Sequence, residues 1–284
     1  MVTSATFADI NKDGWSDLIV AGEWMPLTVF INKQGWFEKT IIPHSTGWWQ
    51  TIFVDDVNKD GQLDILAGNW GWNNKFWSGK NGPVKLYVSD FDKNGRTDQL
   101  LSYMQDGNEY PFFAKDEIER ALPPLRKRYL LYADYAGVEM KKAFKGYTES
   151  VAPLQAERLG SAVCYGNGKG KFTMMDLPAA LQLAPIFAFQ KIPDHNAEEN
   201  HYLAAGNFYD VIPYEGRYDA QPFALFRSYK NNSIQAMPQA NLAAIKGQFR
   251  DIKWLQSIKH GPLVLAAGNN EKMYILKYSL GNGL

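Results

Sequence analysis

The sequence contains little cysteine and no excess of charge of either sign. Cys164 is the single cysteine among 284 residues, which excludes an internal disulfide and a zinc site built on cysteines. The 30 basic and 30 acidic residues balance, and a net charge of zero argues against a nucleic-acid-binding surface, which needs excess positive charge. No run of about 18 apolar residues occurs, so we expect no helix that spans a membrane.

The first residues also lack the features of a signal peptide. Residues 1–9 contain neither a basic segment nor an apolar one. Aromatic residues, in contrast, make up 14% of the chain and are accompanied by 24 glycines, a composition that favours short strands and tight turns. The length suits one large domain or two small ones, with enough chain to bury a hydrophobic core.

Three segments repeat one pattern of apolar strand, acidic loop and apolar strand. They cover residues 7–22, 54–68 and 88–101, and two later segments, 201–207 and 263–269, keep the second strand but lose the loop. Turn signals predict further strands, namely hairpins of 27–32 with 36–42, 161–165 with 171–175 and 223–229 with 233–237, and a last strand at 272–278. Antiparallel sheets of about four strands, repeated about five times, indicate an all-β chain built from blades of a β-propeller.

One segment interrupts these repeats. Residues 115–122, 125–135 and 138–144 are predicted to form short helices, and Pro123 and Pro124 end the first of them. We therefore predict a single propeller-like domain over residues 1–284, with a helical insertion at residues 107–150 inside the third repeat. Insertions in repeat proteins usually lie on one face, which is often the binding face.

The acidic loops place oxygen-bearing side chains at alternating positions. Positions 1, 3, 5 and 9 are Asp9, Asn11, Asp13 and Asp17 in the first loop, Asp56, Asn58, Asp60 and Asp64 in the second, and Asp90, Asp92, Asn94 and Asp98 in the third. Glycine at position 6 lets the backbone turn so that the carbonyl of position 7, from Trp15, Gln62 or Arg96, points inward. Because Ca²⁺ takes about six to eight oxygen ligands, the sequence predicts about three calcium sites, one in each loop.

The loop pattern has two alternatives to such calcium sites. An EF-hand needs a glutamate at position 12 and a helix on each side, but position 12 is Val20, Ala67 or Leu101 and the flanks favour strands. The loops could also be turns rich in Asp and Asn that bind no metal. Three carboxylates in each of three loops favour metal binding, because carboxylates that are not neutralised repel one another.

The loop pattern Asp-x-Asn-x-Asp-Gly-x-x-Asp, followed in two of its copies by Ala-Gly, resembles the FG-GAP or VCBS repeat. The resemblance implies a propeller like that of integrin α-subunits and many bacterial surface proteins, calcium bound by the loop oxygens, and a role in binding. Residues 247–271 also resemble the end of bacterial VCBS-repeat proteins related to the ASPIC/UnbV group, which are exported or lipid-anchored. This implies a location outside the cytoplasm, in the periplasm, on the outer-membrane surface or secreted. Such propellers commonly have seven blades, so a chain with about five is expected to be part of a larger polypeptide.

A fourth loop matches this pattern less well. Aligned on its Ala-Gly step, Asp194, Asn196 and Glu198 occupy positions 1, 3 and 5, but Glu199 replaces the glycine and Tyr202 replaces the aspartate of position 9. We expect no tight metal site in this loop.

A second group of candidate binding residues lies in a segment rich in Trp, Asn and Gly. Trp70, Trp72 and Trp77 are interleaved with Asn73 and Asn74, a combination that suits stacking on a sugar, although large aromatic residues also fill the spaces between blades. We predict a calcium-stabilised module that binds a protein or glycan ligand. The alternative is a carbohydrate-active enzyme, a polysaccharide lyase or hydrolase, on a propeller scaffold. We assign no catalytic residue, since the loop carboxylates are assigned to metal.

Overall fold

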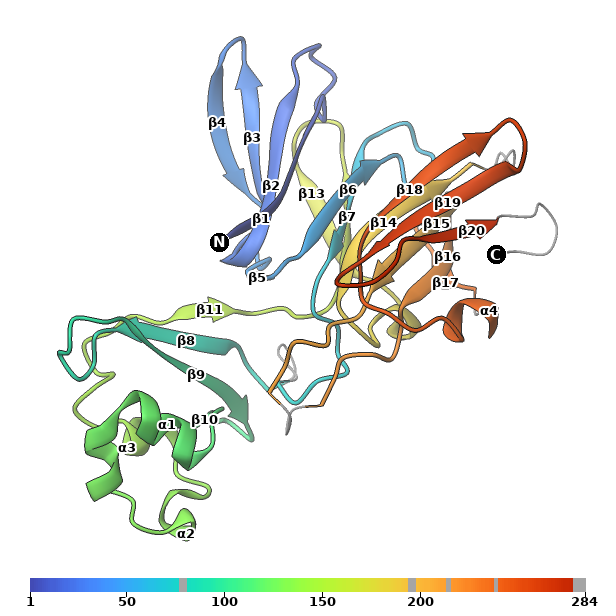
Figure 1. Cartoon of the computed structure of the whole chain (residues 1–284). Coiled ribbons are helices and arrows are strands. Elements are labelled where there is room, and N and C mark those ends of the chain that lie inside the picture. The colour runs from blue at the N-terminus through green and yellow to red at the C-terminus, as the bar shows by residue number, and fades with distance from the viewer. Residues whose placement is uncertain (77–80, 194–197, 213–215, 238–239, 278–284) are drawn as a thin grey trace. The chain divides into compact units, whose positions relative to one another are not determined.

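The computed structural model describes residues 1–76, 81–193, 198–212, 216–237 and 240–277. Strands account for 46% of the chain and helices for 10%, which confirms the mostly β fold that the repeats predicted. The chain divides into two compact units (Figure 1): unit 1 comprises Met1–Asn74 and Leu159–Leu284, and unit 2 comprises Lys75–Arg158. The single domain predicted over residues 1–284 stays a prediction. No helix in the described ranges is long and apolar enough to cross a membrane.

The first sheet of unit 1 surrounds the first acidic loop. It contains β1 (Val2–Ala8), β2 (Asp17–Met25), β3 (Thr28–Lys33) and β4 (Trp36–Ile41) in that order, and the short β5 (Gly47–Trp48) pairs with β2. The acidic loop joins β1 to β2, and β3 and β4 form the predicted hairpin. Because side chains alternate between the two faces of a strand, Ile19, Ala21 and Val29 share one buried face of this sheet.

The second sheet is assembled from two distant parts of the chain. It contains β6 (Thr51–Asp55), β7 (Asp64–Gly68), β12 (Ala162–Gly166) and β13 (Phe172–Asp176), in the order β13-β12-β7-β6. The predicted hairpin at 161–175 is confirmed, but β12 pairs with β7, with Ala162 opposite Ala67. This hairpin therefore completes the sheet of the second loop, although the third loop precedes it in the sequence.

The third and fourth sheets complete unit 1. The third contains β14 (Ile186–Ile192), β15 (Glu199–Gly206), β16 (Phe223–Tyr229) and β17 (Ile234–Ala236) in that order, after a 3-10 helix η2 (Ala179–Leu181). The fourth contains β18 (Phe249–Ser257), β19 (Gly261–Gly268) and β20 (Tyr274–Lys277), after the short α4 (Ala240–Ala243). These sheets contain the hairpin predicted at 223–237 and the predicted last strand, which spans 274–277 of the expected 272–278.

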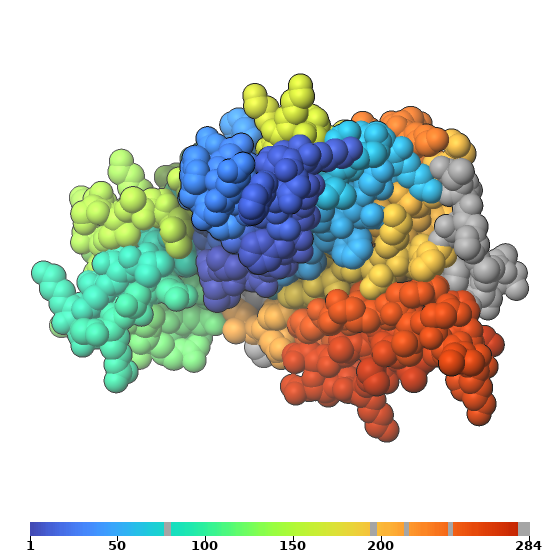
Figure 2. All heavy atoms as spheres, turned by 90° about the horizontal axis from the view of Figure 1, so that it is seen from above, coloured from blue at the N-terminus to red at the C-terminus, as the bar shows by residue number. Residues whose placement is uncertain are grey.

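The four sheets of unit 1 follow one another side by side (Figures 1 and 2). Their first strands are neighbours, since β1 contacts β6, β6 contacts β14, and β14 contacts β18. Three apolar cores fill the spaces between consecutive sheets, and each contains fully buried large aromatic residues: Trp49 in the first, Tyr202 and Phe226 in the second, and Phe249 in the third. No closed sheet is present in the part of the chain that is described.

Unit 2 combines one sheet with short helices. Its strands are β8 (Val84–Ser89), β9 (Asp98–Gln105), β10 (Asn108–Pro111) and β11 (Leu154–Ala156), in the order β10-β9-β8-β11, and the third acidic loop joins β8 to β9. The helices are α1 (Lys115–Ala121), the 3-10 helix η1 (Pro123–Lys127), α2 (Tyr132–Tyr135) and α3 (Met140–Ala143), all of which lie within the predicted range 107–150.

The helix boundaries partly follow the prediction. α1 ends before Leu122, as expected for a residue that precedes a proline. The continuous helix predicted over 125–135 is wrong, because η1 and α2 are separate and Leu131 between them is extended. The amide of Leu131 donates to Asp134 Oδ2 at 2.8 Å, so this aspartate caps a new helix rather than continuing the old one.

Candidate metal-binding loops

The three acidic loops share one backbone conformation. Residues at position 4 of each loop, Lys12, Lys59 and Lys93, have φ of 59°, 57° and 61°, and the glycines at position 6 have φ between 83° and 86°. This left-handed conformation favours glycine because it brings a Cβ atom close to the backbone. The sequence pattern therefore specifies the same tight loop at three places.

The aspartate at position 1 of each loop accepts two backbone hydrogen bonds. In the first loop, Asp9 Oδ1 accepts from the amide of Asp13 at 3.1 Å, and Asp9 Oδ2 accepts from the amide of Gly14 at 2.9 Å. Asp56 and Asp90 accept the same two bonds, at distances from 2.8 to 3.0 Å. Position 1 thus holds the loop closed around its own carboxylate.

The side chains at positions 3 and 5 continue this pattern. Asn11 Oδ1 accepts from the amide of position 5, and Asp13 Oδ1 accepts from the amide of Trp15 at 2.9 Å. In the second and third loops, the position-3 side chain accepts from the amide of position 5 at 3.1 and 3.2 Å. The position-5 side chain accepts from the position-7 amides of Gln62 and Arg96 at 2.7 and 2.8 Å. Side chains from positions 1, 3 and 5 are therefore directed into each loop.

The aspartate at position 9 links the loop to its sheet. Asp17 and Asp64 are fully buried, and their Oδ2 atoms accept from the amides of Ile10 and Val57 at 3.1 and 2.9 Å. Their Oδ1 atoms accept, at 2.8 Å in both cases, from the amides of Asn32 at the end of β3 and Gly166 at the end of β12. In unit 1 this carboxylate therefore connects three strands.

Burial also affects the acidity of one of these groups. Desolvation raises the pKa of Asp64 to about 6, and the negative charge of Asp60 acts in the same direction, whereas the amides of Gly166, Val57 and Asn58 lower it. A buried carboxylate with a raised pKa is stabilised in its charged form by any positive charge nearby.

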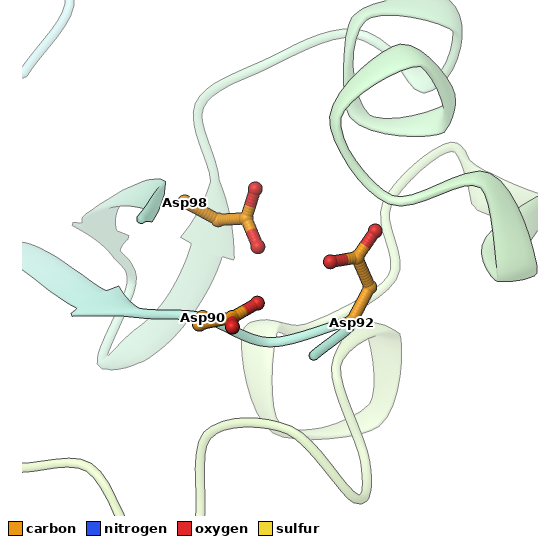
Figure 3. A group of neighbouring side chains, drawn as sticks. All are labelled: Asp90, Asp92 and Asp98. Carbon is orange, nitrogen blue, oxygen red and sulfur yellow. The ribbon is translucent and has the colours of Figure 1, made fainter. Parts of the chain in front are cut away.

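The third loop gathers its carboxylates most closely. Oxygens of Asp90, Asp92 and Asp98 all lie within 4.8 Å of one another, and their carboxyl groups point toward a common space in Figure 3. Asp98 Oδ2 accepts from the amide of Phe91 at 3.0 Å, as at position 9 of the other loops. Three carboxylates at this separation repel one another unless a cation lies between them.

The residue at position 3 explains in part why the carboxylates lie closer together in the third loop than in the first two. In the first two loops it is an asparagine, and Asn11 Nδ2 and Asn58 Nδ2 donate to the carboxylates of Asp13 and Asp60 at 2.9 and 3.0 Å. Asn58 Nδ2 also lies 2.7 Å from Asn232 Oδ1. In the third loop the order of the two residue types is reversed, with Asp92 at position 3 and Asn94 at position 5.

In the degenerate repeat of the third sheet, the residue that aligns with position 9 makes a different contact. Asp194 and Asn196 lie outside the described residues. Tyr202, which aligns with position 9, is fully buried and its hydroxyl donates to Asp55 Oδ2 at 2.6 Å, so a tyrosine joins β15 to β6 there. Burial and the negative charge of Asp55 raise the pKa of the Tyr202 hydroxyl, which therefore stays protonated and acts as a donor.

Three of the five residues predicted to bind a sugar make contacts with other residues of the protein. Trp70 packs against Trp48, Phe208 and Tyr218, with ring centroids 5.8, 5.1 and 5.2 Å away. Asn73 Nδ2 donates to the carbonyl of Leu183 at 3.1 Å, and Asn74 Nδ2 donates to that of Gly71 at 2.7 Å. The side chain of Trp72 is 37% exposed, and Trp77 lies outside the described residues.

The contacts of Trp70 belong to a row of aromatic rings that the sequence analysis missed. Trp24 of β2 lies 5.0 Å from Trp48, Trp48 contacts Trp70, and Trp70 contacts Phe208. The row therefore runs from the first sheet to the segment that follows β15 of the third. The row ends at Arg250 of β18, whose guanidinium lies 4.0 Å from the Phe187 ring and 5.6 Å from the Phe208 ring. An aromatic residue two positions after Ala-Gly, at 24, 70 and 208, is the sequence signal that could have found it.

The comparison with protein families agrees with this geometry. Residues 9–67 match the family model described as an FG-GAP-like repeat. No curated protein matches the chain. The matched segment begins at Asp9 of the first loop and ends at Ala67 in β7, so it contains the first two acidic loops and the strands on both sides of the second loop. This part of unit 1 is therefore similar in sequence to an FG-GAP-like repeat.

Proposed function

We propose that the chain is a calcium-binding part of a β-propeller, which serves outside the cytoplasm in binding a protein or glycan. The observation that carries this proposal is the group of three carboxylates at Asp90, Asp92 and Asp98, in a loop whose hydrogen bonds recur in two others. A turn closed by backbone hydrogen bonds gains nothing from three negative charges within 4.8 Å, whereas a bound cation is stabilised by them.

Calcium suits these loops better than a transition metal. The side chains at positions 1, 3, 5 and 9 offer oxygen atoms alone, and hard cations prefer such ligands. The residues that would hold the ions are these side chains and the backbone at Trp15, Gln62 and Arg96. When bound, an ion would neutralise the carboxylates and so fix each loop. Because sites in extracellular modules commonly bind at about 0.1–1 mM calcium, we expect half-saturation of these loops in that range.

The two end sheets of unit 1 support a propeller that extends beyond the four described sheets. On the first sheet, the face opposite the core carries Phe7 and Ile41, which are 65% and 50% exposed. On the fourth sheet, the opposite face carries Leu255 and Ile275, which are 43% and 61% exposed. Apolar residues on the outer faces of both end sheets favour further sheets packed on them, as in a closed propeller.

Calcium titration of the metal-stripped full chain tests this function. We expect isothermal titration calorimetry to show saturable binding of about three ions per chain, with magnesium binding more weakly. A chain that takes up no calcium would overturn the proposal and leave the loops as hydrogen-bonded turns. The carbohydrate-active enzyme considered as an alternative stays a prediction, because no described residue is assigned a catalytic role.

A further inference from the structure

We propose that unit 2 carries a pocket that binds a sugar residue, an inference that rests on the binding function proposed above and gives it a site. The pocket has a volume of about 330 Å³. It lies between the β9–β10 hairpin and the segment that begins at the end of α2, and its lining includes Tyr103, Tyr110, Tyr135, Gln105 and Asp106. A volume at the small end of the usual range for ligand pockets suits one sugar residue.

Three tyrosines give the pocket its aromatic walls. Tyr103 and Tyr110 lie opposite each other on β9 and β10, with ring centroids 6.4 Å apart and planes inclined by 40°. Tyr135 is held in place, because its hydroxyl donates to the carbonyl of Phe113 at 3.2 Å and its ring lies 5.4 Å from that of Tyr129. All three side chains remain partly exposed, so aromatic surface is available to a ligand. Aromatic rings pack well against the C–H groups on one side of a sugar ring.

Polar groups stand at the turn beside these rings. Gln105 and Asp106 are both exposed, and Asp106 has φ of 50° in the tight turn between β9 and β10. A carboxylate accepts hydrogen bonds at both of its oxygens, and a glutamine amide both donates and accepts. Neighbouring hydroxyls of a sugar also donate and accept, so this pair of side chains matches their chemistry.

The mixed lining and small volume distinguish a sugar from other ligands. A purely apolar ligand would leave the two polar side chains without a role. An extended peptide is recognised along a groove that accommodates several residues, which is longer than a pocket of about 330 Å³. The segment around Trp70 is less suited, since Asn73 and Asn74 already donate to backbone carbonyls.

Saturation-transfer NMR on the full chain in calcium-containing buffer tests the proposal. The probes are glucose, galactose, mannose, N-acetylglucosamine, maltose and cellobiose, each at millimolar concentration. We expect a transfer signal from at least one of them, and a loss of about tenfold or more in affinity in Tyr110→Ala and in Asp106→Asn, which keeps a residue that tolerates the φ of 50°. Asp106 lies exposed in a turn, so its variant tests the pocket even if Tyr110→Ala fails to fold. Trp36→Ala removes a 61% exposed indole from β4 of unit 1 and serves as the control that keeps the signal.

The possible outcomes separate this inference from the proposed function. No signal from any of the six sugars, or an unchanged signal in both pocket variants, would overturn the sugar pocket. Binding of a proline-rich peptide that Tyr110→Ala abolishes, without sugar binding, would assign the pocket to peptides instead. Calcium titration of the same sample is independent of the sugars, so calcium uptake without sugar binding would overturn the pocket alone.

Discussion

The acidic loops of unit 1 and the acidic loop of unit 2 have the same backbone but use their carboxylates differently. In unit 1, Asp17 and Asp64 at position 9 are fully buried and accept hydrogen bonds at both oxygens, one of them from a neighbouring strand. In unit 2, β10 pairs with residues 102–105 of β9, so in the described part of this unit it does not extend to Asp98. Asp98 instead lies close to two other carboxylates.

The difference indicates two roles for one sequence pattern. In unit 1 the position-9 carboxylate satisfies buried backbone amides, a role that does not require a metal. In unit 2 the negative charges of the three clustered carboxylates are less balanced by hydrogen bonds, so we expect a bound cation to stabilise this loop more than those of unit 1. Position 2 also differs, because Ile10 and Val57 are buried between sheets, whereas Phe91 packs with Ile118 and Leu122 in the helical core.

The largest effect is expected from removing the position-9 carboxylate in unit 1. Asp64→Ala leaves the amides of Val57, Asn58 and Gly166 without their acceptor in the interior. We expect the free energy of unfolding of unit 1 to fall by about 3 kcal/mol or more, even in EDTA. Urea unfolding, followed by hydrogen exchange of peptides from each unit, measures this loss.

Asp60→Ala in the same loop is the matched control. Asp60 is exposed and accepts from the amide of Gln62, so its removal should cost about 1 kcal/mol or less without calcium. If Asp64→Ala were as stable as Asp60→Ala in EDTA, the distinction between the two loop types would fail.

A smaller effect is expected from exchanging the residue at position 3 between the two loop types. Asp92→Asn removes one of the three clustered carboxylates. It should raise the stability of unit 2 in EDTA by about 0.5 kcal/mol, through reduced repulsion, and weaken calcium binding there by about tenfold, or about 1.4 kcal/mol. The calcium dependence of hydrogen exchange in residues 81–158 measures both changes.

Asn11→Asp is the reverse exchange in unit 1. It adds a carboxylate beside Asp13 and removes the amide that donates to it, so the signs should be opposite, with lower stability in EDTA and tighter calcium binding. Equal calcium responses in the two variants would show that position 3 does not distinguish the loops.

The local elements could be predicted from the sequence, but their long-range pairing could not. The loops, the flanking strands and the hairpin around residues 167–170 follow from turn residues and apolar runs, which act over a few positions. The pairing of β12 with β7 joins residues about a hundred positions apart, and it depends on packing of Cys164 and Ile65 into one core. Local patterns carry no information on such a contact.

The candidate site could likewise be predicted only where it depends on local sequence. The oxygen positions of the loops are local, and residues 9–67 match the expected repeat. The amides of Asn32 and Gly166 donate to Asp17 and Asp64, and these hydrogen bonds depend on which strand lies beside each loop. The local sequence therefore does not show that both carboxylates already accept hydrogen bonds from a neighbouring strand. The row of rings through Trp24, Trp70 and Phe208 could have been predicted, because an aromatic residue stands two positions after each of three Ala-Gly steps, at 21–22, 67–68 and 205–206.

The smallest difference between the two units is expected at the position-6 glycines, where substitutions should have equal effects in both. Gly14, Gly61 and Gly95 have φ of 86°, 84° and 83°, and a Cβ atom on any of them would meet no atom within 4 Å beyond the two adjoining residues. Alanine at each position should therefore cost about 1 kcal/mol in EDTA, from the left-handed backbone alone. Asparagine tolerates this conformation better than alanine, so Gly→Asn should cost less at all three positions. Because steric crowding is absent, thermal unfolding of the three alanine variants compares the backbone of the loops directly. Equal losses would locate the difference between the units in their carboxylates, whereas a larger loss in Gly95→Ala would mean that the loop backbones themselves differ.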